Sequence, residues 1–111
     1  MTNTVLKKLD QVIQNRMNDS KPEDSYVALL HHKGLNHILK KLGEECSETI
    51  IAAKEIEKPG GKEALIYETA DLWFHSLVLL QHLNCDADDI LSELEKRFYL
   101  SGLVEKANRD K

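Results

Sequence analysis

The chain has 111 residues, enough for one domain built around a single hydrophobic core. Hydrophobic residues make up 41% of it and charged residues 31%, a balance that excludes a disordered tail. Fifteen basic and nineteen acidic residues give a net charge of -4, which argues against a dedicated nucleic-acid binder because no strong positive field collects phosphodiesters.

The N-terminal sequence MTNTVLKKLDQVIQNRM lacks the uninterrupted apolar stretch of a signal peptide. The most apolar run, LWFHSLVLL, is too short to span a bilayer, so we expect a cytoplasmic protein. Cys46 and Cys85 form neither a CxxC pair nor a Cys/His metal pattern, and we interpret them as reduced, small core residues. We expect one domain over residues 1–111.

Helical spacing runs through the chain between four breaks, at residues 19–24, 33–34, 57–61 and 84–88. Apolar residues recur at three- and four-residue steps from Val5 to Met17 and predict an amphipathic first helix. The following segment SYVALLHH predicts a short helix with Ser25 as its N-cap.

Residues 35–56 predict a two-faced helix. One stripe is apolar and is expected to face the core: Ile38, Leu39, Leu42, Cys46, Ile50 and Ala53. The opposite side carries four glutamates: Glu44, Glu45, Glu48 and Glu55. Residues 63–83 predict a helix that is apolar nearly all round and therefore buried on most sides. Asp86 can cap a last helix that carries Ile90, Leu91, Leu94 and Phe98.

The two long helices are joined by a tight turn containing PGG, so they are expected to pack antiparallel as a hairpin. Strands have almost no support. With the flanking helices, the predicted fold is all-α: a four- to five-helix bundle around a central antiparallel hairpin. The apolar second helix has more faces than its short neighbours can cover, which favours a homodimer.

Carboxylates gather on both helices of this hairpin. Glu45 and Glu48 form an i, i+3 pair and share an arc of about 100° with Glu44. The other helix carries a single polar stripe with an arc of about 60°, formed by Glu68, Asp71, His75 and His82. The two histidines either line a pocket or are satisfied core residues.

A solvated helix face is enough to explain the glutamates of the first helix taken alone. Glu68 and Asp71 need more, because a carboxylate in an apolar helix is costly to bury unpaired and no Arg lies near them in sequence. A hard cation with oxygen ligands from both helices removes this cost and the repulsion within the cluster. Mg²⁺ fits best, because it accepts a few carboxylates and completes its coordination with water and phosphate oxygens.

Other metal sites have little support in the sequence. A di-iron bundle needs Glu-x-x-His motifs, and no His in this chain has a Glu three residues before it. The histidines show neither HExxH nor a zinc-finger spacing.

The acidic residues follow an EExxE…ExxD pattern, at Glu44–Glu48 and Glu68–Asp71. Around them stand, in order, SYVALLHHKG, ILKKLGEECSETIIAAK, ETADLWFHSLVLL, LSELEKR and SGLVEKANR. With these motifs the chain, from Leu6 onward, resembles the phosphoribosyl-ATP pyrophosphohydrolase family in its stand-alone form, a branch of the all-α, MazG-like nucleotide pyrophosphohydrolases.

The resemblance implies Mg²⁺-dependent hydrolysis of the α,β-phosphoanhydride of 1-(5-phosphoribosyl)-ATP to 1-(5-phosphoribosyl)-AMP and pyrophosphate, the second step of histidine biosynthesis. By position, the implied metal ligands are Glu45, Glu48, Glu68 and Asp71. Glu44 would be a further ligand or would orient the attacking water. The implied phosphate-binding residues are Lys41, Arg97, Ser101, Gly102 and Lys106. The resemblance also implies a homodimer with both chains at the site, and a link to phosphoribosyl-AMP cyclohydrolase.

Two other functions remain open. A house-cleaning pyrophosphohydrolase acting on dUTP or non-standard nucleotides would use the same metal site with a different base pocket, but would have no reason to keep LEKRFYLSGLVEKANR. A non-catalytic acidic helical adaptor would need no metal, and apolar replacements of Glu68 or Asp71 would then stabilise it without loss of function.

Overall fold

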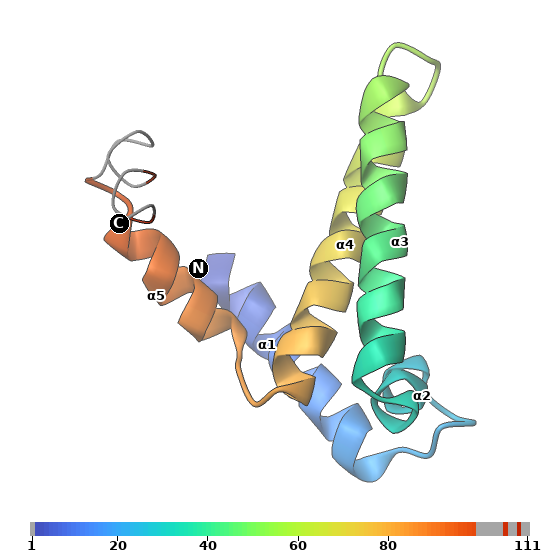
Figure 1. The fold of residues 1–111 in the computed structure, drawn as a ribbon, viewed down its shortest axis with the longest axis vertical. Helices are drawn as coiled ribbons and strands as arrows, with labels where there is room; N and C mark the ends of the chain where they lie inside the picture. Colours follow the sequence, from blue (N-terminus) through green and yellow to red (C-terminus); the bar gives the residue numbers. More distant parts are fainter. Residues whose placement is uncertain (1, 100–105, 107–108, 110–111) are drawn as a thin grey trace.

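The computed structural model describes residues 2–99, 106 and 109, and five helices lie within residues 2–96. They are α1 (Thr2–Asp19), α2 (Tyr26–Lys33), α3 (Leu35–Lys54), α4 (Gly61–His82) and α5 (Ala87–Lys96) (Figure 1). Strands are absent from this described part, so the prediction of an all-α fold with four to five helices is confirmed. Among the described residues, no helix combines the length and the apolar character needed to cross a membrane.

The predicted antiparallel hairpin is formed by α3 and α4, which pack against each other along their length (Figure 1). The turn between them depends on two glycines. Gly60 adopts a left-handed conformation with φ 75°, which is strained for residues with a Cβ. Gly61 is buried, and a Cβ there would overlap the backbone carbonyl of Ile56. The hairpin therefore closes tightly enough to hold the two acidic segments opposite each other.

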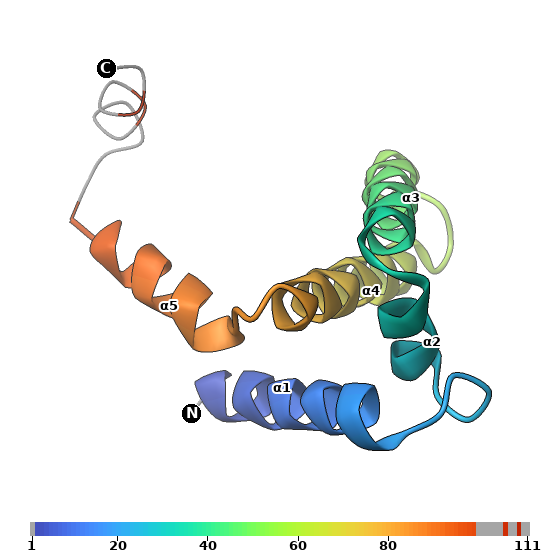
Figure 2. The same ribbon diagram turned by 60° about the horizontal axis from the view of Figure 1, so that its bottom comes forward.

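The core lies at the end of the hairpin where α3 begins and α4 ends. Its fully buried side chains come from four helices: Ile13, Leu30, Ile38 and Val78. Figure 2 shows α1 running beneath α4 and α2 lying between α1 and α3. Both predicted N-caps are confirmed. Ser25 accepts a hydrogen bond from the Ala28 backbone N–H, and Asp86 forms a capping box with Asp89.

One prediction about α3 is wrong. Of the predicted core stripe, Ile38 is buried and Leu42 half-buried, but four members are exposed: Leu39, Cys46, Ile50 and Ala53. Glu45, assigned to the opposite side, is only 5% exposed. The reason is that α4 packs against the face that carries Ile38, Glu45 and Ala52 at steps of two turns. The four exposed members of the apolar stripe therefore lie off the face that packs against α4, and Cys46 is not a core residue.

The prediction that the apolar helix, now α4, is buried on most sides is also wrong for a single chain. Residues 74–82 of α4 are buried or half-buried, but three large side chains nearer its N-terminus remain exposed: Ile66 at 59%, Tyr67 at 70% and Trp73 at 58%. Helix α3 contacts α4 along its length, whereas α1 and α2 contact α4 near its C-terminal end. Much apolar surface on the hairpin is thus left uncovered within one chain.

Candidate metal centre

Four carboxylates meet between α3 and α4. Glu45 and Glu48 extend from α3, Glu68 and Asp71 extend from α4, and one oxygen of each lies within 4.8 Å of the others. Each pair is one helical turn apart, so both members of a pair reach the same side of their helix. The structure thus brings together the four residues predicted as metal ligands.

Thr49 links the two helices beside this cluster. Its Oγ1 contacts two main-chain oxygens, that of Glu45 at 2.9 Å and that of Glu68 at 3.2 Å. The bond to Glu68 crosses from α3 to α4 and fixes the register of one acidic segment against the other. Sequence analysis missed Thr49, because a threonine within a helix more often bonds only to its own preceding turn.

Glu45 is the most buried of the four carboxylates. Burial, together with the neighbouring carboxyl groups of Asp71 and Glu48, raises the pKa of Glu45 to about 7. Its Oε2 atom is buried and has no hydrogen-bond partner among the described residues. A buried carboxylate oxygen without a donor, facing other carboxylates, is a position that a cation stabilises. The all-oxygen donor set fits a hard divalent cation such as Mg²⁺.

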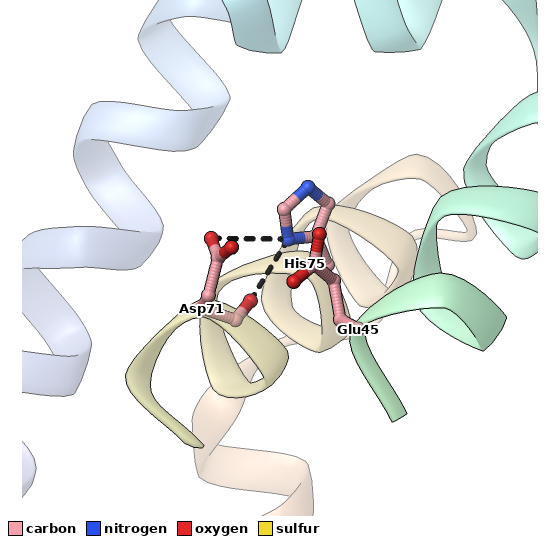
Figure 3. A group of neighbouring side chains, drawn as sticks. All are labelled: Glu45, Asp71 and His75. Carbon is pink, nitrogen blue, oxygen red and sulfur yellow. Dashed lines mark hydrogen bonds and ion pairs between the residues drawn. The ribbon is translucent and has the colours of Figure 1, made fainter. Parts of the chain in front are cut away.

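His75 is 3% exposed and lies beside the cluster. Figure 3 shows Glu45 reaching from α3 toward Asp71 and His75 of α4. The Nδ1 atom of His75 is 2.8 Å from the main-chain oxygen of Asp71 and 3.5 Å from its carboxylate Oδ1. The Nε2 atom is 2.8 Å from the hydroxyl of Tyr26, at the start of α2. Sequence analysis missed Tyr26, because it is 49 residues from His75 and no local spacing relates them.

Lys41 and Glu44 lie next to the cluster and pair with each other. The Lys41 Nζ is 3.2 Å from Glu44 Oε1, and this bond raises the pKa of Lys41. Glu44 is therefore not among the four carboxylates that converge within 4.8 Å. The ammonium group of Lys41, which could bind a phosphate, therefore lies at the edge of the acidic site.

A hollow of about 260 Å³ adjoins the cluster on the side of the PGG turn. Glu48 and Glu68 line it together with Lys58, whose Nζ is 2.8 Å from Glu55 Oε2. It offers space for a ligand that touches the carboxylate site. Lys58 was not predicted as a site residue, because nothing in the sequence distinguishes it from other exposed lysines in turns.

The remaining predicted site residues are not brought to the cluster in one chain. Arg97 is the C-cap residue of α5, and its Nε atom is 3.4 Å from Glu93 Oε2. Helix α5 packs against α1, away from α3 (Figure 1). Lys106 is exposed, whereas Ser101 and Gly102 lie outside the described residues. His82 contacts His31, with their Nδ1 atoms 2.9 Å apart.

Comparison with known proteins shows similarity to a protein family and to a relative of known name. The family model described as phosphoribosyl-ATP pyrophosphohydrolase matches residues 6–98. A relative named phosphoribosyl-ATP pyrophosphatase, from Hydrogenovibrio crunogenus, is 53% identical over 111 residues, covering 100% of this chain and 97% of the relative. The segment matched by the family model spans most of α1, all of α2 to α5 and the positions of the four carboxylates.

Proposed function

The chain belongs to the phosphoribosyl-ATP pyrophosphohydrolase family, and we propose that it hydrolyses 1-(5-phosphoribosyl)-ATP to 1-(5-phosphoribosyl)-AMP and pyrophosphate in histidine biosynthesis. Glu45, Glu48, Glu68 and Asp71 would hold the Mg²⁺ that assists this reaction. The observation that carries the proposal is the convergence of these carboxylates within 4.8 Å, with a buried oxygen of Glu45 left without a donor.

The chain's own residues have distinct tasks in this reaction. Bound Mg²⁺ supplies charge withdrawal from the phosphate oxygens and makes water more acidic. Lys41, at the rim, attracts the phosphates, and Glu44 beside it orients the attacking water or serves as a further ligand. Water attacks the α-phosphorus, the bond between this phosphorus and the oxygen that bridges to the β-phosphorus breaks, and pyrophosphate leaves. The hollow beside Glu48 and Glu68 gives the substrate access to the carboxylates.

We propose a homodimer whose second chain contributes Arg97, Ser101, Gly102 and Lys106 to phosphate binding. Two features support this proposal. The hairpin leaves large apolar side chains exposed, including Ile66 and Trp73. In addition, α5, which ends at the C-cap Arg97, packs against α1, away from α3.

We further propose that residues 1–111 act as one catalytic domain in the cytoplasm. The product, 1-(5-phosphoribosyl)-AMP, is the substrate of phosphoribosyl-AMP cyclohydrolase, so a functional link to that enzyme is part of the proposal. The match over residues 6–98 supports the single domain.

The test is pyrophosphate release from phosphoribosyl-ATP, with and without Mg²⁺, beside ATP and dUTP. We expect turnover of phosphoribosyl-ATP only when Mg²⁺ is present. Glu48→Gln or Asp71→Asn should lower the rate by at least about 100-fold in a folded protein, because a catalytic metal contributes several kcal/mol of transition-state stabilisation. Glu63→Gln is the matched control, since Glu63 is an exposed carboxylate on α4.

The substrate comparison separates the alternatives. Turnover of ATP or dUTP in place of phosphoribosyl-ATP would keep the metal site and assign a house-cleaning activity. Release from none of these substrates would contradict the enzyme and leave the helical adaptor.

A further inference from the structure

A hydrogen-bonded chain runs from α2 to one of the proposed metal ligands. It connects the Tyr26 hydroxyl to Nε2 of His75 at 2.8 Å, and Nδ1 of His75 to the main-chain oxygen of Asp71 at 2.8 Å. The inference drawn from it rests on the proposed function only in taking Asp71 as a ligand of the divalent cation.

The acceptor atoms in this series of hydrogen bonds define where the hydrogen atoms lie. A main-chain carbonyl can only accept, so the Nδ1 of His75 carries the hydrogen that binds the Asp71 oxygen. In the neutral ring the Nε2 atom is then an acceptor, and the Tyr26 hydroxyl donates to it. Burial raises the pKa of Tyr26, which keeps this proton on the phenol.

His75 itself is not available as a metal ligand. One of its ring nitrogens lies within 4.8 Å of carboxylate oxygens of Glu45 and Asp71, so the three form a second possible metal group. Both ring nitrogens, however, are already engaged by protein groups. The ring is also packed edge-on against Tyr26 and Phe74, with centroids 5.7 Å and 5.5 Å away. His75 is therefore held in one orientation, with its Nδ1–H directed at Asp71 (Figure 3).

We propose that Tyr26 is a positioning residue of the metal centre: by holding His75, its hydroxyl keeps the Asp71 carboxylate in the orientation that binds a divalent cation. The Nδ1–H of His75 is bonded to the Asp71 main-chain oxygen, and the same nitrogen lies 3.5 Å from Asp71 Oδ1, so the ring packs beside the carboxylate. A rotated ring would open space there and leave the carboxylate free to change rotamer. Groups that orient a ligand from outside the coordination shell typically contribute about 10- to 100-fold to metal affinity. Tyr26 acts one residue further out, so its contribution is smaller.

The test measures Mn²⁺ binding to the purified protein by calorimetry, without substrate. Tyr26→Phe keeps the ring and removes only the hydroxyl, and it should weaken Mn²⁺ binding by about 3- to 10-fold, below the range for a direct partner. The KM for phosphoribosyl-ATP at saturating Mg²⁺ should stay unchanged. Tyr99→Phe is the matched control, because Tyr99 is 94% exposed, and it should bind Mn²⁺ like the wild type.

A double-mutant cycle tests whether His75 transmits the effect. In His75→Asn the side-chain amide can replace the Nδ1–H but cannot reach Tyr26 as well. We expect this variant to lose Mn²⁺ affinity and Tyr26→Phe to have no further effect in it. Additive losses would overturn the proposal, because Tyr26 would then act independently of His75.

Other outcomes also decide the matter. Unchanged Mn²⁺ affinity in Tyr26→Phe, with a raised KM, would make Tyr26 a substrate contact and overturn the proposal. A lower melting temperature with unchanged affinity would reduce it to a structural residue. A wild-type protein that binds Mn²⁺ in this Tyr26-dependent way but does not hydrolyse phosphoribosyl-ATP would contradict the proposed function and leave the positioning role intact.

Discussion

Glu45 is a buried carboxylate whose neighbours are other carboxyl groups, so its burial costs stability unless a cation is bound. The hairpin buries it to 5% exposure, yet its Oε2 has no donor and its neighbours are carboxyl groups. Its pKa of about 7 lies above the ordinary value of 4.5, so the folded protein binds a proton that the unfolded chain has lost between those pH values. Stability of the metal-free protein therefore falls as pH rises from 4.5 to 7, and the full cost remains above 7.

Glu45→Gln should remove this cost while keeping the shape of the side chain. In the presence of a chelator at pH 8, we expect a higher melting temperature than in the wild type, with the difference disappearing near pH 4.5 as Glu45 becomes protonated. Added Mg²⁺ should stabilise the wild type more than the variant, because binding to the folded state alone shifts unfolding. The measurement is thermal unfolding by circular dichroism.

Glu63→Gln serves again as the control, since Glu63 is exposed. Equal melting temperatures for the wild type and Glu45→Gln at pH 8 would show that Glu45 is not destabilising in the metal-free fold.

At the scale of elements, a buried hydrogen bond links α5 to α1. The Asp10 Oδ2 accepts a hydrogen bond of 2.8 Å from the backbone N–H of Ala87, the first residue of α5. Asp10 is 8% exposed and Ala87 3% exposed, so water does not replace this bond easily. Because α5 carries Arg97, this contact also sets where a predicted phosphate-binding residue lies.

Asp10→Ala should leave the Ala87 N–H buried and unpaired, which costs about 1–3 kcal/mol in the free energy of unfolding. Asp10→Asn keeps an acceptor oxygen and should lose less. Urea unfolding measures the loss, and amide hydrogen exchange should become faster in α5 before it does in α3 and α4. If Asp10→Ala unfolds at the same urea concentration as the wild type, the contact does not hold α5.

At the scale of the whole molecule, the exposed apolar residues of the hairpin are the main feature left unexplained by one chain. They lie on both long helices, as Ile50 and Ile51 on α3 and as Ile66, Tyr67 and Trp73 on α4. Ile66 and Trp73 are about two turns apart and share one face of α4. An exposed apolar face usually marks an interface. It is the physical argument for the proposed homodimer.

We therefore expect sedimentation equilibrium to give twice the chain mass of 12.7 kDa. Ile66→Asp introduces a charge on this surface, at a side chain that is 59% exposed, and should shift the protein toward the monomer mass and lower activity if both chains form the site. Lys62→Asp is a control on an exposed charged residue of the same helix. A wild-type protein that sediments as a monomer would contradict the dimer.

Much of this structure was predictable because the relevant signals are local. Periodicity and breaks gave the helices, Ser25 and Asp86 marked two helix starts, and the PGG turn predicted the hairpin. The i, i+3 spacing of the acids predicted that four carboxylates would share the space between two helices. The EExxE…ExxD motif and its context also identified the family that the comparisons confirm.

Tertiary structure alone decided which face of α3 meets α4. Helical periodicity shows which residues share a face, but not which face a neighbour covers, so Glu45 was assigned outward and Ile50 inward, the reverse of what is found. Contacts between distant segments were equally out of reach, as with Tyr26 on His75 and Thr49 on Glu68. The amino-acid sequence determined the helices and the acidic chemistry, whereas packing decided which carboxylate is buried and which residue orients its neighbour.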